Sequence, residues 1–464
     1  MITVIKNASY VIGFENGSHC IYKDGEVAFQ EDRIIFVGKE YPGEAQKMID
    51  ARGGIVSPGL IDMQVDLQST LLEKSNIEDT GNPFHFMDDQ GALTELEDVE
   101  KEDQLAMTEF SLAELLSKGV TTVFVKGNGD EDVIDRVGKS GVRAVYSPVV
   151  SSCRLSRWER KKLIYEKQRG NHGISDLEQV KKLREKYEGS YDGRMSIALG
   201  LRSSDTCDPE LLDKAAKLLE DDSSMLCSIG AAQTVDEFVE IAYRYGITPA
   251  DYLHNHGIYG PRVIYVNYMM RSGHNMNTMI LGDEIDRIAR DRTNVVNCPW
   301  RYGRRGIVME SFQKYHDAGI NMGLGTDSSS LDMMLEMRYA SIFCKYAEHV
   351  NPLKGKAGII FNAATVNAAR ALGREDIGRL QAGAKADLII VDIKNLDCSP
   401  MRDPIKSLVF TATGKNVTHV FVDGMELVDE TGVKGMNKKA LVRAVQDLVG
   451  KYKNDIPMSF PIRQ

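Results

Sequence analysis

The sequence predicts an α/β protein, namely a TIM-type (β/α)8 barrel with a small β-sandwich built from both ends of the chain. Between about residues 100 and 380, short apolar runs alternate with amphipathic segments, as in parallel βα units. About eight such units over some 300 residues match the size of a barrel. Strand-and-turn patterns fill the first 56 residues and return after residue 380.

The barrel prediction rests on strands and helices that follow each other in turn. Strands are expected over 120–127, 142–148, 195–201, 225–231, 263–267, 294–299 and 320–327, and helices over 104–119, 133–141, 209–221, 234–246, 283–291 and 311–319. A basic run, 154–169, is predicted as an amphipathic helix after the third strand, with a solvated face. A lid or a dimer contact is the alternative interpretation of that run.

The two ends of the chain have a strand pattern of their own. Strands are expected over 2–14, 20–30, 33–38, 53–59, 386–393, 407–412 and 417–424, and a final helix over 438–452. We expect one composite sandwich domain from 1–56 and 380–464, and a barrel domain from 57–379. Two separate small domains are the alternative, and periodicity does not decide between them.

Composition limits the function classes. The chain has 464 residues, of which 42% are hydrophobic, and a formal net charge of -10. An acidic chain lacks the basic footprint that general nucleic-acid binding requires. The 7 cysteines are scattered, which indicates reduced thiols in a cytoplasmic protein. The first residues read as a strand, not a signal peptide, and no run of about 18 apolar residues predicts a membrane span.

Six segments together resemble one known family. They are 51–67, 119–127, 198–212, 231–253, 320–338 and 364–393, and they occur in the family's order. On these segments the chain resembles the amidohydrolase superfamily, most closely its cytosine deaminase and chlorohydrolase branch. The resemblance implies the barrel and sandwich, a small-molecule substrate, hydrolysis of carbon–nitrogen bonds other than peptide bonds, and a homodimer.

The resemblance also implies a metal site that this sequence has altered. Relatives hold a divalent metal with a His-x-His pair, two further histidines and an Asp after strand eight. The matching positions here are Gln64, Asp66, Gly230, Asn267 or His274, and Asp327, while the proton-shuttling Glu matches Gln233. Gln64 and Asn267 offer neutral amide oxygens, which bind zinc poorly, and Gly230 offers no side chain at all. We therefore expect no cofactor, with a magnesium or calcium site at Asp66 and Asp327 as the alternative.

Positive side chains stand where relatives have metal-facing or substrate-facing groups. Lys126 ends the second strand, Arg202 takes the place of a substrate-facing His, and Arg301, Arg304 and Arg305 follow strand seven. Strand ends share one rim in a barrel, so an anion-binding pocket is one interpretation. Pairing of these arginines with acids such as Asp205, Asp66 or Asp327 is the other. Further candidate substrate contacts are Gln64, Gln233, Asn267, Trp300 and His85.

Three functions remain open from the sequence. The first is a metal-independent enzyme in which Asp327 is the general base, with Asp66 and His274 as further acid or base groups. Its substrate would be a small anionic or cyclic metabolite with a carbon–nitrogen bond, and lyase or isomerase chemistry stays possible. The second is an inactive scaffold or partner subunit. The third is a metal hydrolase that uses His274, Asp327 and Asp66. The pair His254 and His256 is interpreted as the end of a helix.

Overall fold

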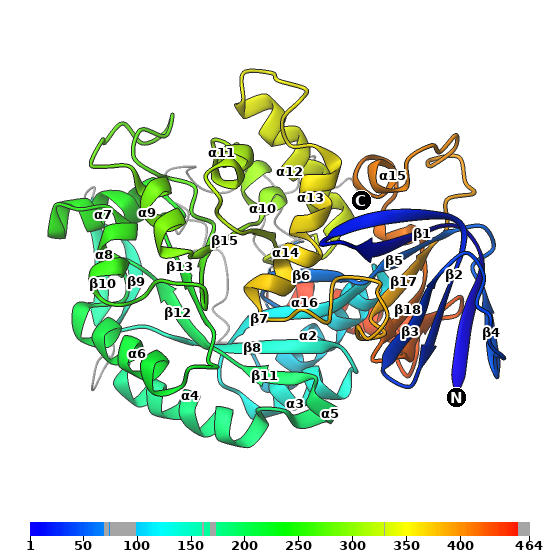
Figure 1. The fold of residues 1–464 in the computed structure, drawn as a ribbon. Coiled ribbons are helices and arrows are strands. Elements are labelled where there is room, and N and C mark those ends of the chain that lie inside the picture. The colour runs from blue at the N-terminus through cyan, green and yellow to red at the C-terminus, as the bar shows by residue number, and fades with distance from the viewer. Residues whose placement is uncertain (69–73, 75–98, 160–161, 168–172, 329, 453–464) are drawn as a thin grey trace, which may run out of the picture.

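Two nine-stranded sheets organise the molecule. The computed structural model describes residues 1–68, 74, 99–159, 162–167, 173–328 and 330–452. One sheet curls into a barrel with helices around it, and the other lies beside the barrel (Figure 1). The predicted fold class is therefore confirmed.

The barrel sheet is parallel throughout. Its strands are β6 (Leu60–Val65), β7 (Val120–Gly127), β8 (Arg143–Val150), β11 (Met195–Ile197), β12 (Leu199–Ser203), β13 (Cys227–Gly230), β14 (Val263–Val266), β15 (Asn294–Asn297) and β16 (Met322–Leu324). Both β11 and β12 pair with β8, so they form one interrupted strand. Eight strand positions result, in the chain order that a barrel of this type requires.

The barrel closes where its last strand meets its first. Val65 and Asp327 form a parallel bridge just beyond β16. The Asp327 N–H donates to the Gln64 carbonyl at 2.7 Å, and the Asp66 N–H donates to the Asp327 carbonyl at 2.9 Å. Backbone hydrogen bonds therefore hold these three residues together at the carboxyl ends of the strands.

The outer layer consists of helices that begin at recognisable caps. The helices up to residue 371 are α2 (Lys101–Ser117), α3 (Glu131–Lys139), α4 (Ile174–Tyr187), α5 (Ser190–Gly193), α6 (Pro209–Asp221), α7 (Val235–Tyr245), α8 (Pro249–Asn255), α9 (Glu284–Asp291), α10 (Pro299–Gly303), α11 (Phe312–Asp317), α12 (Met333–Ala347), α13 (Ala357–Ala363) and α14 (Val366–Ala371). Asp208, Thr234 and Thr248 accept hydrogen bonds from the first turns of α6, α7 and α8. His254 and His256 lie at the end of α8, as predicted.

The second sheet joins both ends of the chain. Its strands are β1 (Ile2–Glu15), β2 (Ser18–Gln30), β3 (Arg33–Gly38), β4 (Lys47–Asp50), β5 (Ile55–Pro58), β17 (Leu388–Val391), β18 (Val417–Val422), β19 (Met425–Asp429) and β20 (Gly432–Val433). Strand β17 pairs with β5 on one side and with β18 on the other. One composite sheet therefore exists instead of two separate small units. The domain boundaries at 56 and 380 stay a prediction.

Two element predictions are wrong. The basic run expected as a helix is a hairpin of β9 (Cys153–Glu159) and β10 (Lys162–Lys167), in which Leu163 pairs with Trp158. Aromatic and β-branched residues favour such pairing over a helix. The strand expected over 407–412 is part of helix α15 (Pro404–Phe410), because Asp403 caps the chain just before Pro404.

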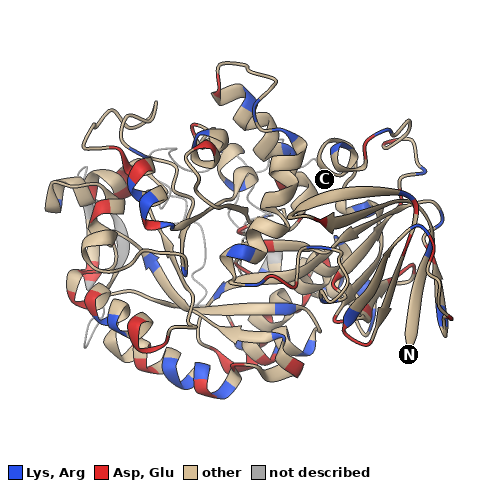
Figure 2. Cartoon of the chain, viewed as in Figure 1, with Lys and Arg blue, Asp and Glu red and all other residues tan. Residues whose placement is uncertain are grey.

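The predicted final helix is confirmed. It is α16 (Lys438–Tyr452), which packs against α2. A short 3-10 turn over Gly414–Asn416 precedes β18. Within the described residues, no helix has both the length and the apolar character needed to cross a membrane. Acidic and basic residues are interspersed along the outer helices (Figure 2).

Candidate active site

Asp327 is the centre of the polar cluster at the carboxyl ends of the barrel strands. Its side chain is almost buried and its backbone φ is 56°, in the left-handed region that non-glycine residues seldom adopt. Asn267, directly after β14, has a φ of 57° and is fully buried. Such backbone geometry persists only where the surroundings enforce it, and it is often found at functional sites.

Arg301 contributes the positive partner of Asp327. Its Nη1 lies 2.5 Å from the Asp327 Oδ1 and also donates to the Ser328 hydroxyl. Helix α10 positions this guanidinium, since Pro299 starts the helix directly after Cys298. A close guanidinium favours the ionised carboxylate, and an ionised carboxylate can accept a proton.

A chain of hydrogen bonds leads from Asp327 to the end of strand five. The Asn267 Nδ2 lies 3.5 Å from the Asp327 Oδ2 and 3.4 Å from the Tyr302 hydroxyl. That hydroxyl donates to the Gln233 Oε1 at 2.9 Å. The side-chain Oδ1 of Asn267 accepts from the Cys298 N–H at 2.8 Å, which fixes the orientation of the amide. Tyr302 is a site residue that the sequence patterns did not single out.

Lys126 lies among charges of both signs. Burial lowers the pKa of its ammonium group, and nearby Arg202 and Arg301 lower it further, while Asp327 and Asp66 act in the opposite direction. These interactions bring five of the predicted residues into one electrostatic cluster. Loss of a hydration shell and like-charge neighbours both disfavour the protonated amine.

The fifth barrel strand, β13, ends at Gly230, which has no side chain and so offers no metal ligand. A Cβ at Gly230 would lie 2.0 Å from the Gln233 Nε2 and 2.8 Å from the Arg202 carbonyl oxygen. Real Cβ atoms do not approach other atoms so closely, so the Gln233 amide fills the space of a side chain at position 230. Gln233 is itself held by its N–H, which donates to Glu237 at 2.8 Å.

Other predicted residues contact their surroundings in ways that the sequence did not suggest. The ring of His274 lies 3.2 Å from the Val308 carbonyl oxygen and accepts from the Met276 N–H at 3.1 Å, within loops. The Trp300 ring packs on Tyr339 of α12, with ring centres 4.9 Å apart. The Arg304 Nε lies 3.3 Å from the Arg301 carbonyl oxygen. His85 lies outside the described residues.

The sequence left open whether Asn267 or His274 is the strand-six residue that reaches Asp327. Asn267 follows β14 directly and contacts Asp327, whereas the described contacts of His274 are with the backbone of 276 and 308. Burial lowers the pKa of the His274 imidazole. Its predicted role in catalysis therefore lacks support from the described contacts. For Arg301 the contacts favour pairing with an acid over an open anion-binding pocket, because its guanidinium binds Asp327.

Asp62 is a buried acid that the sequence analysis did not select. It lies on β6 and accepts from the Thr326 hydroxyl at 2.5 Å, the Thr326 N–H at 3.0 Å and the Gln64 N–H at 3.2 Å. Burial raises the pKa of its carboxyl to about 7. Its position two residues before Gln64 was the available signal. Asp62 therefore links β6, the first barrel strand, to the turn after β16, the last barrel strand, where Asp327 lies.

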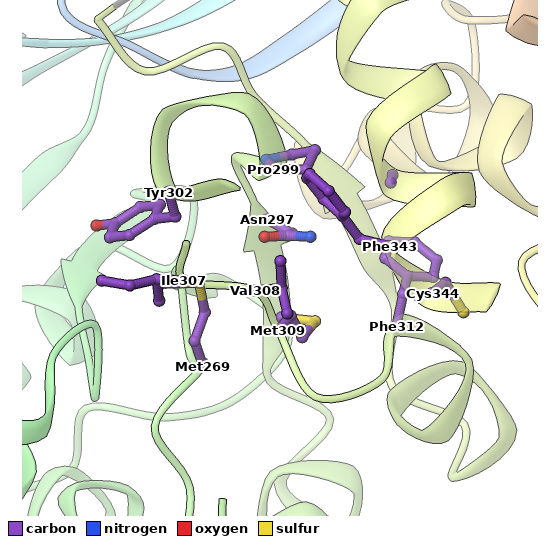
Figure 3. Close-up of a pocket in the computed structure, with 11 residues that line it drawn as sticks. Met269, Asn297, Pro299, Tyr302, Ile307, Val308, Met309, Phe312, Phe343 and Cys344 are labelled. Carbon is purple, nitrogen blue, oxygen red and sulfur yellow. The ribbon is translucent and has the colours of Figure 1, made fainter. Parts of the chain in front are cut away.

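A small cavity adjoins the site but is too small for a substrate. It lies beside Asn297 and Tyr302 and is otherwise lined mostly by apolar residues, among them Met309 and Phe343 (Figure 3). Its volume is about 10 Å³, roughly what one buried water requires. The Asn297 Oδ1 is buried there without a hydrogen-bond partner, so a single water suits the space.

The fold combines a parallel barrel, an aspartate after the eighth strand and a composite terminal sheet. This combination is typical of one class of barrel hydrolases. The chain belongs to the Amidohydrolase family, which matches residues 55–427. It is 28% identical over 460 residues to 5'-deoxyadenosine deaminase of Methanosarcina mazei, with 97% of this chain and 98% of that protein covered. It is 27% identical to 5-methylthioadenosine/S-adenosylhomocysteine deaminase of Pelotomaculum thermopropionicum, with 96% and 98% covered.

Solved structures show the same fold. An adenosine deaminase from Xanthomonas campestris with bound zinc superposes with a TM-score of 0.82 at 22% identity, covering 97% of this chain and 98% of its own. Atrazine chlorohydrolase TrzN from Arthrobacter aurescens, complexed with zinc, gives 0.79 at 21% identity, covering 96% and 100%. The expected hydrolase of carbon–nitrogen bonds other than peptide bonds is confirmed as a class.

The expectation of no cofactor is contradicted. Both solved neighbours carry zinc, and the family relatives give no support to a metal-independent enzyme, to an inactive scaffold or to a rearranged metal site. The side chains present nevertheless do not fit the family's ligand set. Gly230 has no donor, and the Gln233 amide fills its space. Among the described residues, no three His, Cys, Asp or Glu side chains are placed to share a metal ion.

Proposed function

We propose that the chain is a hydrolytic deaminase that removes an exocyclic amino group from a small, nucleoside-like ring. The deaminase relatives match along almost the whole chain, which supports this reaction for the barrel and the terminal sheet together. In a hydrolytic deamination, water adds across a ring C=N bond, and the exocyclic C–N bond then breaks to release ammonia and leave a carbonyl group. Residues at the barrel mouth carry out the proton transfers of this reaction.

The observation that carries the proposal is the contact between Asp327 and Arg301. Their 2.5 Å contact places a guanidinium beside a nearly buried carboxylate at the mouth of the barrel, and such a neighbour favours the ionised form. An ionised carboxylate in that position can take a proton from an attacking water, which is general-base catalysis. Asn267 holds the second carboxylate oxygen at 3.5 Å and so orients the base.

The charges around Lys126 give the site its second function. Arg202 and Arg301 are close enough to Lys126 to lower its pKa, beyond the larger effect of burial. A partly buried group of cations stabilises negative charge that develops on a ring nitrogen, and it also binds an anionic substituent of the substrate. Because the pKa of Lys126 is lowered, its ammonium group can also donate a proton to the departing amine.

Ammonia release from a defined set of nucleosides tests the proposal. The set contains 5'-deoxyadenosine, 5'-methylthioadenosine, S-adenosylhomocysteine and adenosine, each assayed with and without added zinc. Release of ammonia with formation of the corresponding oxo-purine from at least one compound is expected. Absence of product from all four compounds in both arms would overturn the nucleoside assignment.

A further inference from the structure

Glu336 is a fully buried acid on helix α12. Burial raises the pKa of its carboxyl well above the ordinary value, and the nearby charges of Asp62 and Asp332 raise it further. An uncharged side chain of the same shape can therefore take its place. A buried polar group is costly unless hydrogen bonds compensate for the lost water, so the partners of Glu336 indicate what it holds in place.

The two side-chain oxygens of Glu336 bind two different segments. The Oε2 accepts from the Trp300 N–H at 2.9 Å, in the first turn of α10. The Oε1 accepts from the Ser330 hydroxyl at 2.6 Å, three residues after Asp327. Cys298 stands at the cap position of α10, where Ser, Thr, Asp or Asn is usual, and a side chain from another helix supplies the acceptor instead. Glu336 therefore joins α10 to the segment after β16.

The same face of α12 also packs against the rest of α10. Tyr339, three residues after Glu336, packs its ring on Trp300, with ring centres 4.9 Å apart. Phe343 lies against Gly303, where an added Cβ would collide with the phenyl ring. Spacings of three and seven residues place the three α12 side chains on one helix face. Helix α10 is thus held on α12 from its first turn to its last residue.

The two segments that Glu336 joins carry the pair on which the proposed reaction depends. Arg301 follows Trp300 in α10, and its Nη1 lies 2.5 Å from the Asp327 Oδ1. The Glu336 hydrogen bonds therefore fix the chain on both sides of that contact, next to Arg301 through Trp300 and just after Asp327 through Ser330. A displacement of about 1 Å at such a site can reduce the rate about 100-fold.

We propose that Glu336 is a positioning residue, which keeps the Arg301 guanidinium in contact with the Asp327 carboxylate by binding the Trp300 N–H and the Ser330 hydroxyl together. This role rests on the proposed function, in which Asp327 is the general base. Glu336 itself touches neither substrate nor water in this role and acts through the placement of Arg301.

Glu336→Leu and Glu336→Gln test the role in the full chain. Leucine lacks both acceptors, so Arg301 should move away from Asp327, and the acidic limb of the pH–rate profile should rise by about 0.5 pH unit or more. The values of kcat and kcat/KM should fall together, by about tenfold or more, since a misplaced base is felt in the transition state. Glutamine can accept from the Trp300 N–H and donate to the Ser330 oxygen, so it should restore both properties almost to wild type.

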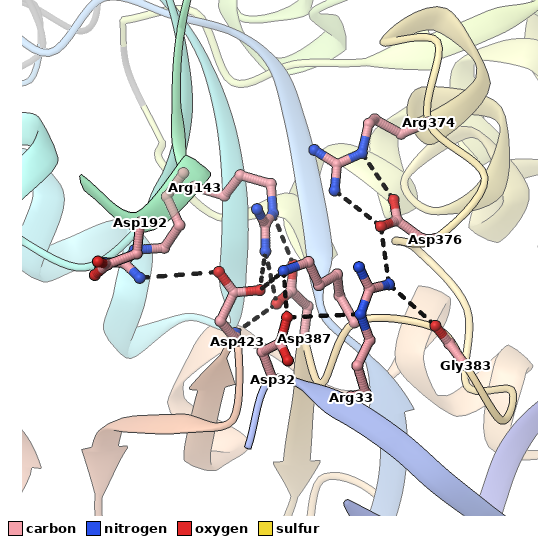
Figure 4. Close-up of polar contacts among 11 residues, drawn as sticks. Asp32, Arg33, Arg143, Asp192, Arg374, Asp376, Gly383, Asp387 and Asp423 are labelled. Carbon is pink, nitrogen blue, oxygen red and sulfur yellow. Dashed lines mark hydrogen bonds and ion pairs between the residues drawn. The ribbon is translucent and has the colours of Figure 1, made fainter. Parts of the chain in front are cut away.

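Asp387→Asn is the matched control for loss of a buried carboxylate. Asp387 is 2% exposed and accepts two hydrogen bonds from Arg143 at the junction of barrel and terminal sheet (Figure 4). Both Asp387→Asn and Glu336→Leu should lower the melting temperature, but only Glu336→Leu should move the acidic limb. Lys126 and Asp62, which also interact with the charge of Asp327, stay unchanged in these variants.

Ser330→Ala gives a milder variant that serves where Glu336→Leu does not fold. It removes one of the two hydrogen bonds at a partly exposed residue, and it should move the acidic limb in the same direction by a smaller amount. Crystal structures of the variants measure the distance between Arg301 and Asp327 directly. That distance should increase in Glu336→Leu and stay unchanged in Glu336→Gln and Asp387→Asn.

Two results would overturn the positioning role. One is an acidic limb that stays at its wild-type pH in Glu336→Leu and Ser330→Ala while the melting temperature falls as it does in Asp387→Asn. The other is a crystal structure of either variant in which Arg301 and Asp327 keep their full contact. The crystal structures require no turnover, so a wild-type chain that releases no ammonia would reject the proposed function while the placement of Arg301 is still tested.

Discussion

The side-chain amide of Gln233 occupies the volume into which a side chain at position 230 would project. The Nε2 would lie 2.0 Å from a Cβ there, and the Arg202 carbonyl oxygen would lie at 2.8 Å. Position 230 therefore offers no side chain, and the Gln233 amide fills the space that one would need. A side chain at position 230 would fit only if Gln233 moved or were shortened.

Gly230→Ala should therefore destabilise the fold. The added methyl group meets a backbone oxygen that cannot rotate away, and overpacking of this kind costs about 1–3 kcal/mol. Urea denaturation measures the change. Gly358→Ala in helix α13 is the matched control, because its Cβ would meet open space. Adding Gln233→Ala to the variant should recover part of the loss, and an unchanged midpoint for Gly230→Ala would contradict the packing described.

Asp327→Asn should reduce ammonia release about 100-fold or more, because an amide cannot accept the proton. The substitution keeps the size of the side chain, and its carbonyl oxygen can still accept from Arg301. Steady-state kinetics on the best substrate measures the change, with circular dichroism as a folding check. Asp213→Asn, on an exposed residue that pairs with His256, is the control and should retain full activity. Equal rates for the two variants would remove Asp327 from the mechanism.

Arg301→Met should move the acidic limb of the pH–rate profile to higher pH, by about one pH unit or more. Asp327 loses its positive neighbour in this variant and so takes up a proton more readily. Arg301→Lys keeps a positive charge and should shift the limb less. The rate is measured across pH 4 to 8. An unmoved acidic limb in Arg301→Met would show that another group controls it.

Asp62→Asn should flatten the dependence of stability on pH. The pKa of Asp62 is raised to about 7 in the folded chain, above its ordinary value of 3.8. Its contribution to stability is therefore fully present below about pH 4 and is lost as the pH rises through 7, on the order of a few kcal/mol. Unfolding free energies at pH 4.5, 6 and 8 measure this. The prediction fails if wild type and variant lose stability in parallel.

Arg143→Met should be strongly destabilising. The guanidinium is 4% exposed and binds Asp387 at 3.0 Å and Asp423 at 2.6 Å, both of which are also buried. Removing the cation takes the ion pair from buried Asp387, while Asp423 keeps Lys385 and Arg194, and breaking a buried pair costs about 3–5 kcal/mol. Adding Asp387→Asn should restore part of the stability. Arg443→Met, on the exposed face of α16, is the control, and a similar melting temperature for both single variants would contradict the network.

The fold could be predicted from the sequence because hydrophobic periodicity marks each strand and helix locally. Thus 234–246 gave a helix that the Thr234 side chain begins and Gly246 ends. The two errors arose where local pattern and pairing disagree. The run 154–169 has a helical charge pattern, yet β9 and β10 pair with each other as antiparallel strands. At 407–412 an apolar run resembled a strand, but the cap at Asp403 decided for a helix.

The candidate site could be predicted only in part. Residues directly after strands, such as Asp327 and Asn267, were placed correctly because strand ends meet at one rim of a barrel. Tyr302 was missed, since nothing in the chain marks a tyrosine in a short helix as the link between Gln233 and Asn267. The space above Gly230 was equally hidden, because a sequence shows that a side chain is absent but not what replaces it.

The composite sheet also sets an order of events during synthesis. Strand β5 needs β17 as its neighbour, and the whole barrel lies between them in the chain. Since the ribosome delivers the amino-terminal strands first, they wait with an unpaired edge while the barrel is made. A chain released after the barrel but before β17 would keep that edge open, so premature termination there would produce aggregation instead of a shorter active enzyme.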